Sequence, residues 1–519
     1  MSVNLHRRWF LLPILSGVLL VLTFHPFNVW PLGFVALAPL YYFVGGFPHT
    51  RWIVFWGGFI AGGIFSFCLS YYTIVQFHWL PEAYLFVGAV RLLVVPITLL
   101  GGAMCGGAML LYRALRCDSL LGNALLAAAL YTAAEVALGY IFGGYYLGLL
   151  AYAATPVPLV LSIAALGGAH AVSFVLAFVN GYVAEACIVW RANRPAVLRA
   201  AVVALCFAAL VLLPNWIYLH QPLPTTQTFS VVLLQQGSRE RMVFGKEHDG
   251  IFSWGMGGRL TDAASSSPDL VIYPFSPVEG ALYRAEAPAF NKEVLVASEK
   301  SVARFLAEVM PARVPLMTWN NVYADGNFYN QYEVWQDGAV AAQYQKRVLF
   351  AFMDYTPLWA QRIGLFSTPF DVVAGAQDNR LVLGDIALGG LMCSELHNTT
   401  LARAEARVAP LIIAVGSEAM FQDDVASAFS LKAAQLRAVE NNVPVIRGNI
   451  LGPSAIIDRF GSLSAFAPAG AEATIAADVA LTAPRATLYN RLGGWLVALL
   501  ICGILGNAWH TRSRAKTLL

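Results

Sequence analysis

A chain of 519 residues in which 58% are hydrophobic and only 12% carry a charge is too apolar for an ordinary soluble protein, because soluble domains carry about 25% charged residues. Its formal net charge of +3 is too small to indicate a nucleic-acid-binding protein. Composition and charge therefore predict a polytopic membrane protein.

The first 220 residues are almost continuously apolar, which predicts a transmembrane domain over 1–220. A helix needs about 20 predominantly apolar residues to cross a bilayer. About seven runs approach this length, at 9–25, 29–47, 52–76, 84–112, 119–140, 157–189 and 198–219. A last apolar run at 490–509 predicts a closing span within a C-terminal segment of 489–519.

Arginines mark alternate connections between these runs. They precede the first run and occupy every second connection and the tail, at Arg7, Arg8, Arg51, Arg113, Arg116, Arg191, Arg194, Arg199, Arg512 and Arg514. Because basic loops stay in the cytoplasm, we expect both termini there and the segment after the seventh span on the opposite face. In a bacterium, this predicts an inner-membrane protein with a periplasmic domain.

Residues 221–488 lose the apolar character and carry charged residues at an ordinary frequency. We expect strands at 229–234, 270–272 and 411–415 and helices at 298–309 and 425–441. The dipeptide Asp337-Gly338 between 329–335 and 339–345 is a strong hairpin signal. This alternation of strands and helices predicts an α/β or α+β domain.

One segment of this domain has the pattern of a strand that presents a nucleophile. Residues 384–392 are apolar and dotted with glycine, and they lead into Cys393, with Glu395 two residues further on. The other six cysteines lie in or beside the long hydrophobic runs, so Cys393 is expected to have no disulfide partner in the polar middle of the chain. A small buried core residue is an equally good interpretation. His397 invites a cysteine–histidine pair, although a single histidine in a polar loop is more often incidental.

Several further segments occur in an order that is typical of one family. They are Leu234–Gly237, Tyr344–Leu349, Asp354–Leu358, Cys393–Glu395, Arg437–Glu440 and Arg447–Asn449. Together they resemble the apolipoprotein N-acyltransferases, the membrane members of the nitrilase (carbon–nitrogen hydrolase) superfamily. The resemblance covers nearly the whole chain.

The resemblance implies a fold and a chemistry. It implies a transmembrane domain joined to a nitrilase-like αββα sandwich over 221–488. Cys393 matches the family's nucleophile and Lys346 matches its lysine, while Glu395 and Asp354 are either supporting residues or ordinary surface carboxylates. The implied reaction moves an acyl chain from a phospholipid through a cysteine thioester to the N-terminus of a diacylglyceryl lipoprotein. It needs no metal or other cofactor and no nucleic acid, and we expect a monomer.

The chain departs from the family at the position of the general base. The family has a Trp-Pro-Glu turn where this chain has Tyr273, Pro274 and Phe275, and a phenylalanine accepts no proton. Glu279, four residues further on, is the nearest carboxylate. Two interpretations stay open: Glu279 replaces the usual base, or the chain is a divergent or non-catalytic relative that acts on another periplasmic amine or binds a lipid or a partner protein.

A transporter is a third and weaker hypothesis. Glu82, Arg91 and Glu135 lie in or near the expected spans, and ionisable groups inside a membrane often mark a pathway. Three scattered groups without paired interrupted helices make a poor transporter pattern.

Overall fold

The computed structural model describes most of the chain as two compact units. The described residues are 10–72, 93–144, 148–237, 259, 262–263, 265–274, 282–283, 314–324, 326–351, 354–362, 372–376, 380–417, 424–483 and 485–517. The first unit comprises Met1–Gln221 and Ala486–Leu519, and the second comprises Pro222–Arg485.

The first unit is helical. Its described elements are α2 (Leu11–Thr23), η1 (Trp30–Phe34), α3 (Ala38–Gly46), α4 (Arg51–Ser70), α6 (Val94–Leu115), α7 (Leu120–Ile141), η4 (Leu150–Ala154), α8 (Pro158–Leu161), α9 (Ala164–Gly167), α10 (Ala169–Val189), α11 (Arg194–His220), α17 (Leu488–Leu492) and α18 (Trp495–Thr517). Within the described ranges, five helices (α4, α6, α7, α10 and α11) are long and apolar enough to cross a membrane. The expectation of a multi-pass membrane domain is therefore confirmed.

The expected run at 157–189 is not one continuous helix. It is divided into α8, α9 and α10, and the last break falls at Gly168. Gly168 has a φ of 76°, in the left-handed region that glycine adopts without strain. Apolar composition alone did not predict this break, because one glycine with a left-handed backbone leaves the mean hydropathy of the run unchanged.

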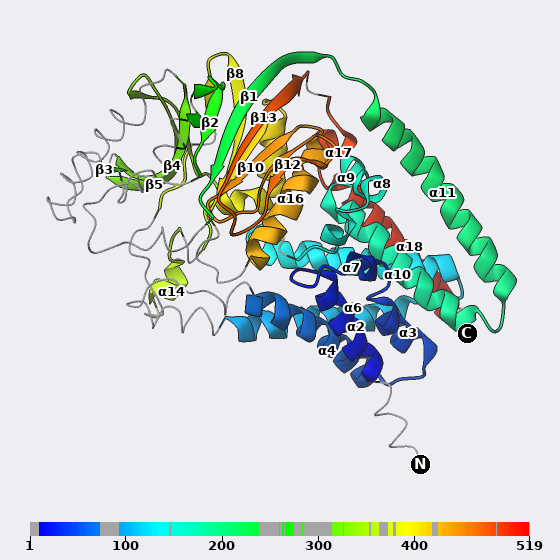
Figure 1. Cartoon of the computed structure of the whole chain (residues 1–519). Helices are drawn as coiled ribbons and strands as arrows, with labels where there is room; N and C mark the ends of the chain where they lie inside the picture. The colour runs from blue at the N-terminus through cyan, green and yellow to red at the C-terminus, as the bar shows by residue number, and fades with distance from the viewer. Residues whose placement is uncertain are drawn as a thin grey trace. The chain divides into compact units, whose positions relative to one another are not determined.

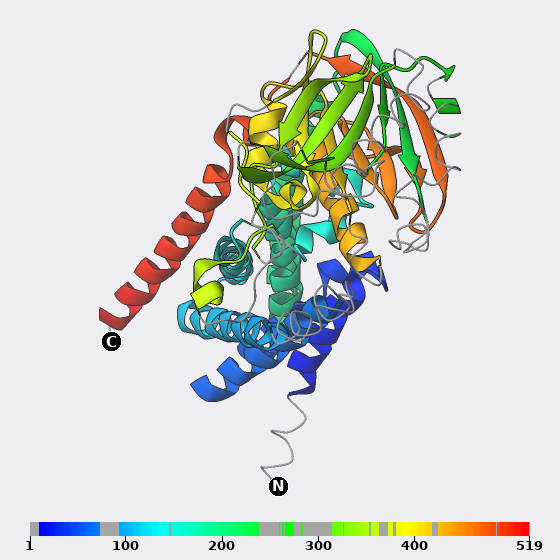
Figure 2. The same cartoon turned by 90° about the vertical axis from the view of Figure 1, so that its left-hand side faces the viewer.

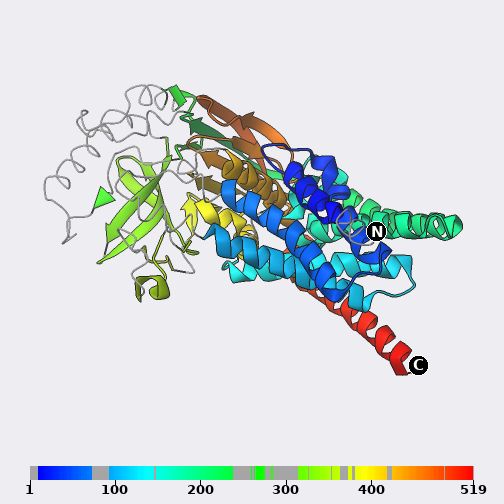
Figure 3. The same ribbon diagram turned by 90° about the horizontal axis from the view of Figure 1, so that it is seen from below.

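Helices α4 and α6 lie side by side and pack closely (Figure 3). Glycines make this approach possible: a Cβ added at Gly62 would lie 2.7 Å from the Gly101 carbonyl oxygen, and one added at Gly58 would lie 2.8 Å from the Gly106 Cα. Small residues that let two backbones approach are typical of helix contacts inside membranes, where packing replaces the hydrophobic effect.

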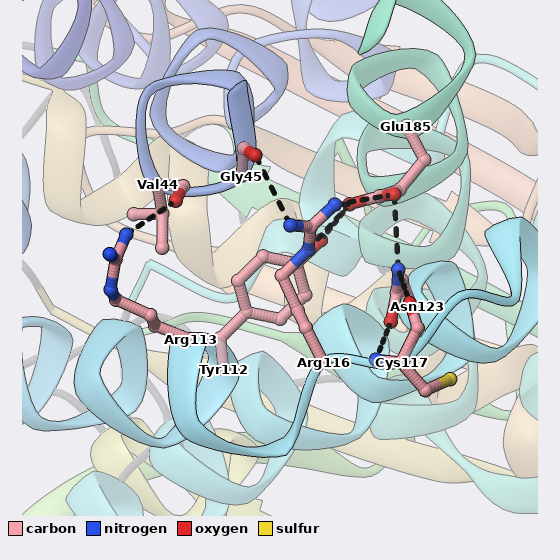
Figure 4. Close-up of polar contacts among 8 residues, drawn as sticks. All are labelled: Val44, Gly45, Tyr112, Arg113, Arg116, Cys117, Asn123 and Glu185. Carbon is pink, nitrogen blue, oxygen red and sulfur yellow. Dashed lines mark hydrogen bonds and ion pairs between the residues drawn. The ribbon is translucent and has the colours of Figure 1, made fainter. Parts of the chain in front are cut away.

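A buried carboxylate joins three helices of this unit (Figure 4). Glu185 on α10 is 1% exposed. It accepts hydrogen bonds from the Tyr112 hydroxyl at 2.7 Å, from Arg116 Nη2 at 2.7 Å and from Asn123 Nδ2 at 3.1 Å. Tyr112 and Arg116 belong to the end of α6 and Asn123 belongs to α7, so one charge holds the ends of three helices together.

Arg116 and its neighbour Arg113 also bind carbonyl groups at the end of α3 (Figure 4). Arg116 Nη1 donates to the Gly45 carbonyl at 3.1 Å, and Arg113 Nη1 donates to the carbonyls of Val44 and Phe47 at 3.3 Å each. The last carbonyls of a helix have no intrahelical partner, and cations stabilise that end of the helix dipole. This cluster therefore fixes the end of α3 against α6.

Glu135, one of the three residues behind the transporter hypothesis, has local partners. Its Oε2 lies 3.2 Å from His170 Nδ1, and its Oε1 accepts a hydrogen bond from the Leu150 N–H at 2.9 Å. These contacts tie α7 to α10 and η4. Glu82 and Arg91 lie outside the described residues.

The second unit contains two mixed sheets that lie face to face (Figure 2). The first has the order β13-β1-β2-β4-β5-β6, with β3 beside β4, and its strands are β1 (Thr225–Gln235), β2 (Leu270–Ile272), β3 (Leu282–Tyr283), β4 (Leu316–Ala324), β5 (Asn327–Gln336), β6 (Ala339–Gln345) and β13 (Ala473–Thr482). The second has the order β12-β11-β10-β9-β8-β7, and its strands are β7 (Leu381–Leu383), β8 (Ile386–Met392), β9 (Ile412–Gly416), β10 (Val445–Asn449), β11 (Ser454–Ile457) and β12 (Leu463–Ala467).

Apolar side chains from both sheets form one core, which includes Phe229, Leu233, Ile413 and Ile446. Helices α15 (Thr399–Ala406) and α16 (Val425–Asn441) pack on the second sheet. Figure 1 shows α16 beside the strands of this sheet. The expected α/β domain is confirmed, with two sheets that share one core. The helix expected at 298–309 lies outside the described residues.

The expected hairpin is confirmed as β5 and β6. Asp337 and Gly338 form its turn, with φ values of 50° and 78°. A two-residue turn with positive φ at both positions matches the twist of the flanking strands, and Asp-Gly tolerates it well. The hairpin matters for the site because the chain leaves β6 directly into Lys346.

We predict that Glu185→Gln destabilises the protein. The substitution leaves the partly buried Arg116 without its counter-charge, and breaking a buried ion pair costs about 3–5 kcal/mol. Because the Arg116 side chain is 23% exposed, we expect the lower end of this range, about 3 kcal/mol. Thermal unfolding in one detergent measures it. Asp118→Asn, which removes the same charge at an exposed position, is the control, and equal midpoints for the two variants would contradict the prediction.

Candidate active site

Cys393 lies where β8 ends. It is the first residue of a short 3-10 helix, Cys393–His397, and its φ is 52°. A residue other than glycine rarely adopts the left-handed region, and such strain is concentrated at functional sites. Gly416, at the end of the neighbouring parallel strand β9, allows this turn, because a Cβ added there would lie 3.1 Å from the Cys393 Cα. The thiol is thereby placed at the carboxyl edge of the second sheet.

Lys346 is buried and paired. It is 3% exposed, and its Nζ lies 2.5 Å from Asp354 Oδ2. Asp354 also accepts hydrogen bonds from the Phe350 N–H at 2.7 Å and from Asn330 Nδ2 at 2.8 Å. A carboxylate with these two further donors holds the ammonium group in one place, and neither Lys346 nor Asp354 is a solvated surface residue.

Glu395 connects the Lys346 segment to the end of β8. It is 0% exposed, and its Oε1 accepts from the N–H groups of Arg347 at 2.7 Å and Val348 at 2.8 Å. Its Oε2 accepts from the Met392 N–H and from the Tyr344 hydroxyl, each at 2.8 Å. Burial raises the pKa of Glu395, and the hydrogen bonds from Met392 and Val348 oppose that rise. Of the two interpretations of Glu395, the surface carboxylate is wrong.

A second carboxylate makes a parallel connection that the sequence analysis missed. Glu405 on α15 pairs with the Arg347 guanidinium, and its Oε2 accepts from the Gly390 N–H at 3.0 Å. The Gly389 N–H bonds the carbonyl of Leu411, the residue before β9. Because successive N–H groups of a strand alternate in direction, those of Gly390 and Met392 point to the opposite edge of β8. On that edge, β8 pairs with β7 only as far as Leu388. The two carboxylates therefore complete this edge and join it to Lys346 and its neighbours.

His397 lies buried and contacts helix α16. It is 6% exposed, and its Nε2 lies 3.2 Å from the Ser430 hydroxyl on α16. Burial, together with the charges of Arg437 and Arg447, lowers its pKa to about 3. It is thus a neutral core residue near neutral pH.

Glu279, the candidate for the missing base, and Phe275, which stands in the family's base position, lie outside the described residues. In the part of the chain that the structure describes, no group of three His, Cys, Asp or Glu side chains could hold a metal ion.

The lowered pKa of His397 predicts an acid-sensitive contribution to stability. Between pH 6.5 and about 3, His397 binds a proton in the unfolded chain but stays neutral in the folded chain. The free energy of unfolding therefore decreases as the pH falls through this window. His397→Gln should therefore show a shallower loss of thermal midpoint between pH 7 and pH 4 than the wild type. His510→Gln, at an exposed position, should keep the wild-type slope. Equal slopes in all three proteins would refute the assignment.

Comparisons with known proteins cover both units. Residues 16–182 match the family model of the apolipoprotein N-acyltransferase N-terminal domain, and residues 268–488 match the carbon-nitrogen hydrolase model. The apolipoprotein N-acyltransferase of Sinorhizobium medicae is 26% identical over 487 residues, with 86% of each chain covered. That of Geobacter metallireducens is 26% identical over 510 residues, with 94% of this chain and 92% of that protein covered.

Among solved structures, a Saccharomyces cerevisiae member of branch 10 of the nitrilase superfamily is 16% identical, with a TM-score of 0.36, over 51% of this chain and 94% of that chain. One family model matches the helical unit and the other matches the α/β unit, and the relatives align over most of their length. The chain belongs to the apolipoprotein N-acyltransferase family.

Proposed function

We propose that this protein is a membrane N-acyltransferase. It moves a fatty acyl chain from a phospholipid to Cys393 and then to an amine, the N-terminus of a diacylglyceryl lipoprotein. The observation that carries the proposal is the connection, through buried Glu395, between the strand end that presents Cys393 and the segment that presents Lys346. Family membership supplies the class of reaction, since the relatives are apolipoprotein N-acyltransferases.

The first half-reaction forms a thioester. A thiol with an ordinary pKa of about 8.5 is mostly protonated at neutral pH, so a base must take the proton as Sγ attacks the ester carbonyl. The electron pair of the C=O bond moves to oxygen and returns as the lysophospholipid alkoxide leaves. The alkoxide takes the proton from the base, and the acyl group stays on Cys393.

The second half-reaction regenerates the enzyme. The acceptor amine attacks the thioester carbonyl, and the base takes its proton. The Cys393 thiolate leaves and is protonated, so that one amide bond has replaced one ester bond. A thioester is suited to this step because it transfers its acyl group to an amine more readily than an ester does.

Lys346 and Asp354 supply fixed charge in this scheme. An ammonium group near the thiol favours the thiolate, and a fixed cation stabilises the oxyanion of each tetrahedral intermediate. Such stabilisation requires that the donor does not reorganise during the reaction, and Asp354 restrains Lys346 in this way. Glu395 acts on the same geometry through the backbone, because its four donors leave it no role as a free base.

We further propose that Glu279 takes the role of general base that the family's glutamate has at the position of Phe275. Phe275 favours a second candidate, a non-catalytic relative that binds a lipid or a partner protein. For the location, we propose a bacterial inner membrane with the unit Pro222–Arg485 in the periplasm, because every basic connection falls on one side of the expected spans. We propose a monomer without a cofactor.

The nucleophile can be tested by intact-mass spectrometry of protein incubated with phospholipid vesicles. We expect one acyl adduct on Cys393, released by hydroxylamine, and none in Cys393→Ala. Lys346→Ala should slow adduct formation by about 10²–10³-fold, the usual loss when an oxyanion donor is removed. Cys502→Ala, an exposed cysteine of the helical unit, is the control. Full acyl transfer by Cys393→Ala would disprove this mechanism.

The base can be tested with a pair of substitutions in the same assay. Glu279→Gln should slow acylation by about 10²–10⁴-fold, the range for a general base. Phe275→Glu should restore much of that loss in the Glu279→Gln background. If the wild type forms no adduct with any phospholipid while Phe275→Glu alone does, the binding-protein candidate replaces the enzyme.

A further inference from the structure

Tyr332 connects the two sheets near the end of the strand that leads into Cys393, the proposed nucleophile. It lies on β5 of the first sheet and is 0% exposed. Its hydroxyl lies 2.8 Å from the Leu391 carbonyl on β8, and it accepts a hydrogen bond from the Val415 N–H on β9 at 3.0 Å. It also contacts the Val415 carbonyl. One phenol thus binds the backbones of two strands of the opposite sheet.

The contacts fall in the last two residue pairs of the β8–β9 ladder, since Leu391 pairs with Ala414 and Val415 pairs with Met392. Met392 on β8 pairs with Val415 on β9, and that pair ends the β8–β9 ladder. The next residues along the two strands are Cys393, with its left-handed backbone, and Gly416, which closely approaches the Cys393 Cα. Val415 is therefore followed directly by the glycine against which the Cys393 turn packs.

A second tyrosine extends the arrangement to the other side of the turn. Tyr344 pairs with Tyr332 across β5 and β6, and the rings stack with centroids 5.7 Å apart. The Tyr344 hydroxyl donates to Glu395. The two tyrosines therefore contact the chain on both sides of Cys393, Tyr332 two residues before it at Leu391 and Tyr344 two residues after it at Glu395.

Tyr332 is not suited to acid–base chemistry itself. Burial, followed by the charge of Glu395, raises its pKa well above the ordinary value. It remains a neutral hydroxyl at any pH where the protein works, and its hydrogen-bonding capacity is already used by backbone groups. A neutral group with fixed backbone partners can set geometry, and it does not exchange protons with the thiol.

We propose that Tyr332 is a positioning residue for Cys393. Its hydroxyl fixes the ends of β8 and β9 relative to each other, and this fixes the strained turn from which the thiol attacks. The inference rests on the proposed function for its effect on turnover. Its effect on the thiol itself holds whether or not the protein transfers acyl groups.

The test uses the full-length protein in detergent and the variant Tyr332→Phe, which removes only the hydroxyl. The first readout is the pH dependence of Cys393 alkylation by iodoacetamide, followed at the Cys393 peptide by mass spectrometry. We expect the apparent pKa of the Cys393 thiol to shift, because a displaced turn changes the distance between the sulfur and the charged side chains of the site.

The second readout is acylation by phospholipid vesicles. Here kcat should fall at least about fivefold, which corresponds to the free energy of one hydrogen bond, at an unchanged KM. Tyr329→Phe, on the same strand at a half-buried position, should change neither readout.

A second variant keeps the proposal testable if Tyr332→Phe folds poorly. Gly416→Ala places a Cβ against the Cys393 backbone and should displace the same turn from the opposite side. If both substitutions act on that turn, the fold-loss of kcat in the double variant should be smaller than the product of the two single fold-losses.

An alkylation profile and a kcat within twofold of wild type for a folded Tyr332→Phe would overturn the proposal. A wild type that forms no acyl adduct, while the alkylation profile still shifts in Tyr332→Phe, would overturn the acyltransferase function and leave the positioning role intact.

Discussion

The buried carboxylate of Glu395 is the group on which the rest of the site depends. A carboxylate without solvent is unfavourable unless donors satisfy it, and this one has four: three backbone N–H groups and the Tyr344 hydroxyl. Those donors come from two segments that are far apart in the chain. The loss of solvation at Glu395 is thus offset only when the Lys346 segment and the end of β8 are both in place.

Features that depend on neighbours in the chain were predictable from the sequence. The helix expected at 425–441 has the bounds Val425–Asn441, because apolar spacing with a helical period is a local signal. The β5–β6 hairpin followed from two residues that tolerate positive φ. The strand before Cys393 was expected from 384 and begins at Ile386. In each case, neither packing nor distant contacts were needed.

Features that depend on distant contacts were not predictable. The Tyr332 hydroxyl reaches partners 59 and 83 residues away, and Glu405 pairs with a residue 58 positions earlier. No spacing rule connects such residues, since the connection exists only after two sheets and a helix have packed. Conversely, Lys346, Cys393, Glu395 and Asp354 were proposed as site residues because they stand in segments with a recognisable order. The sequence thus suggested candidate side chains and left unspecified the contacts that hold them.

The cost of this network bears on the choice between an enzyme and a binding protein. Replacing a buried ion pair with apolar side chains of similar size is often neutral or stabilising. The buried pairs Lys346–Asp354 and Arg347–Glu405 are therefore weak evidence for a purely stabilising role. Both pairs are present and buried, and Glu395 with its four donors joins them to Cys393. Polar groups that stability does not require are expected where chemistry requires them, so the network favours a working thiol even though Phe275 stands in the place of the usual base.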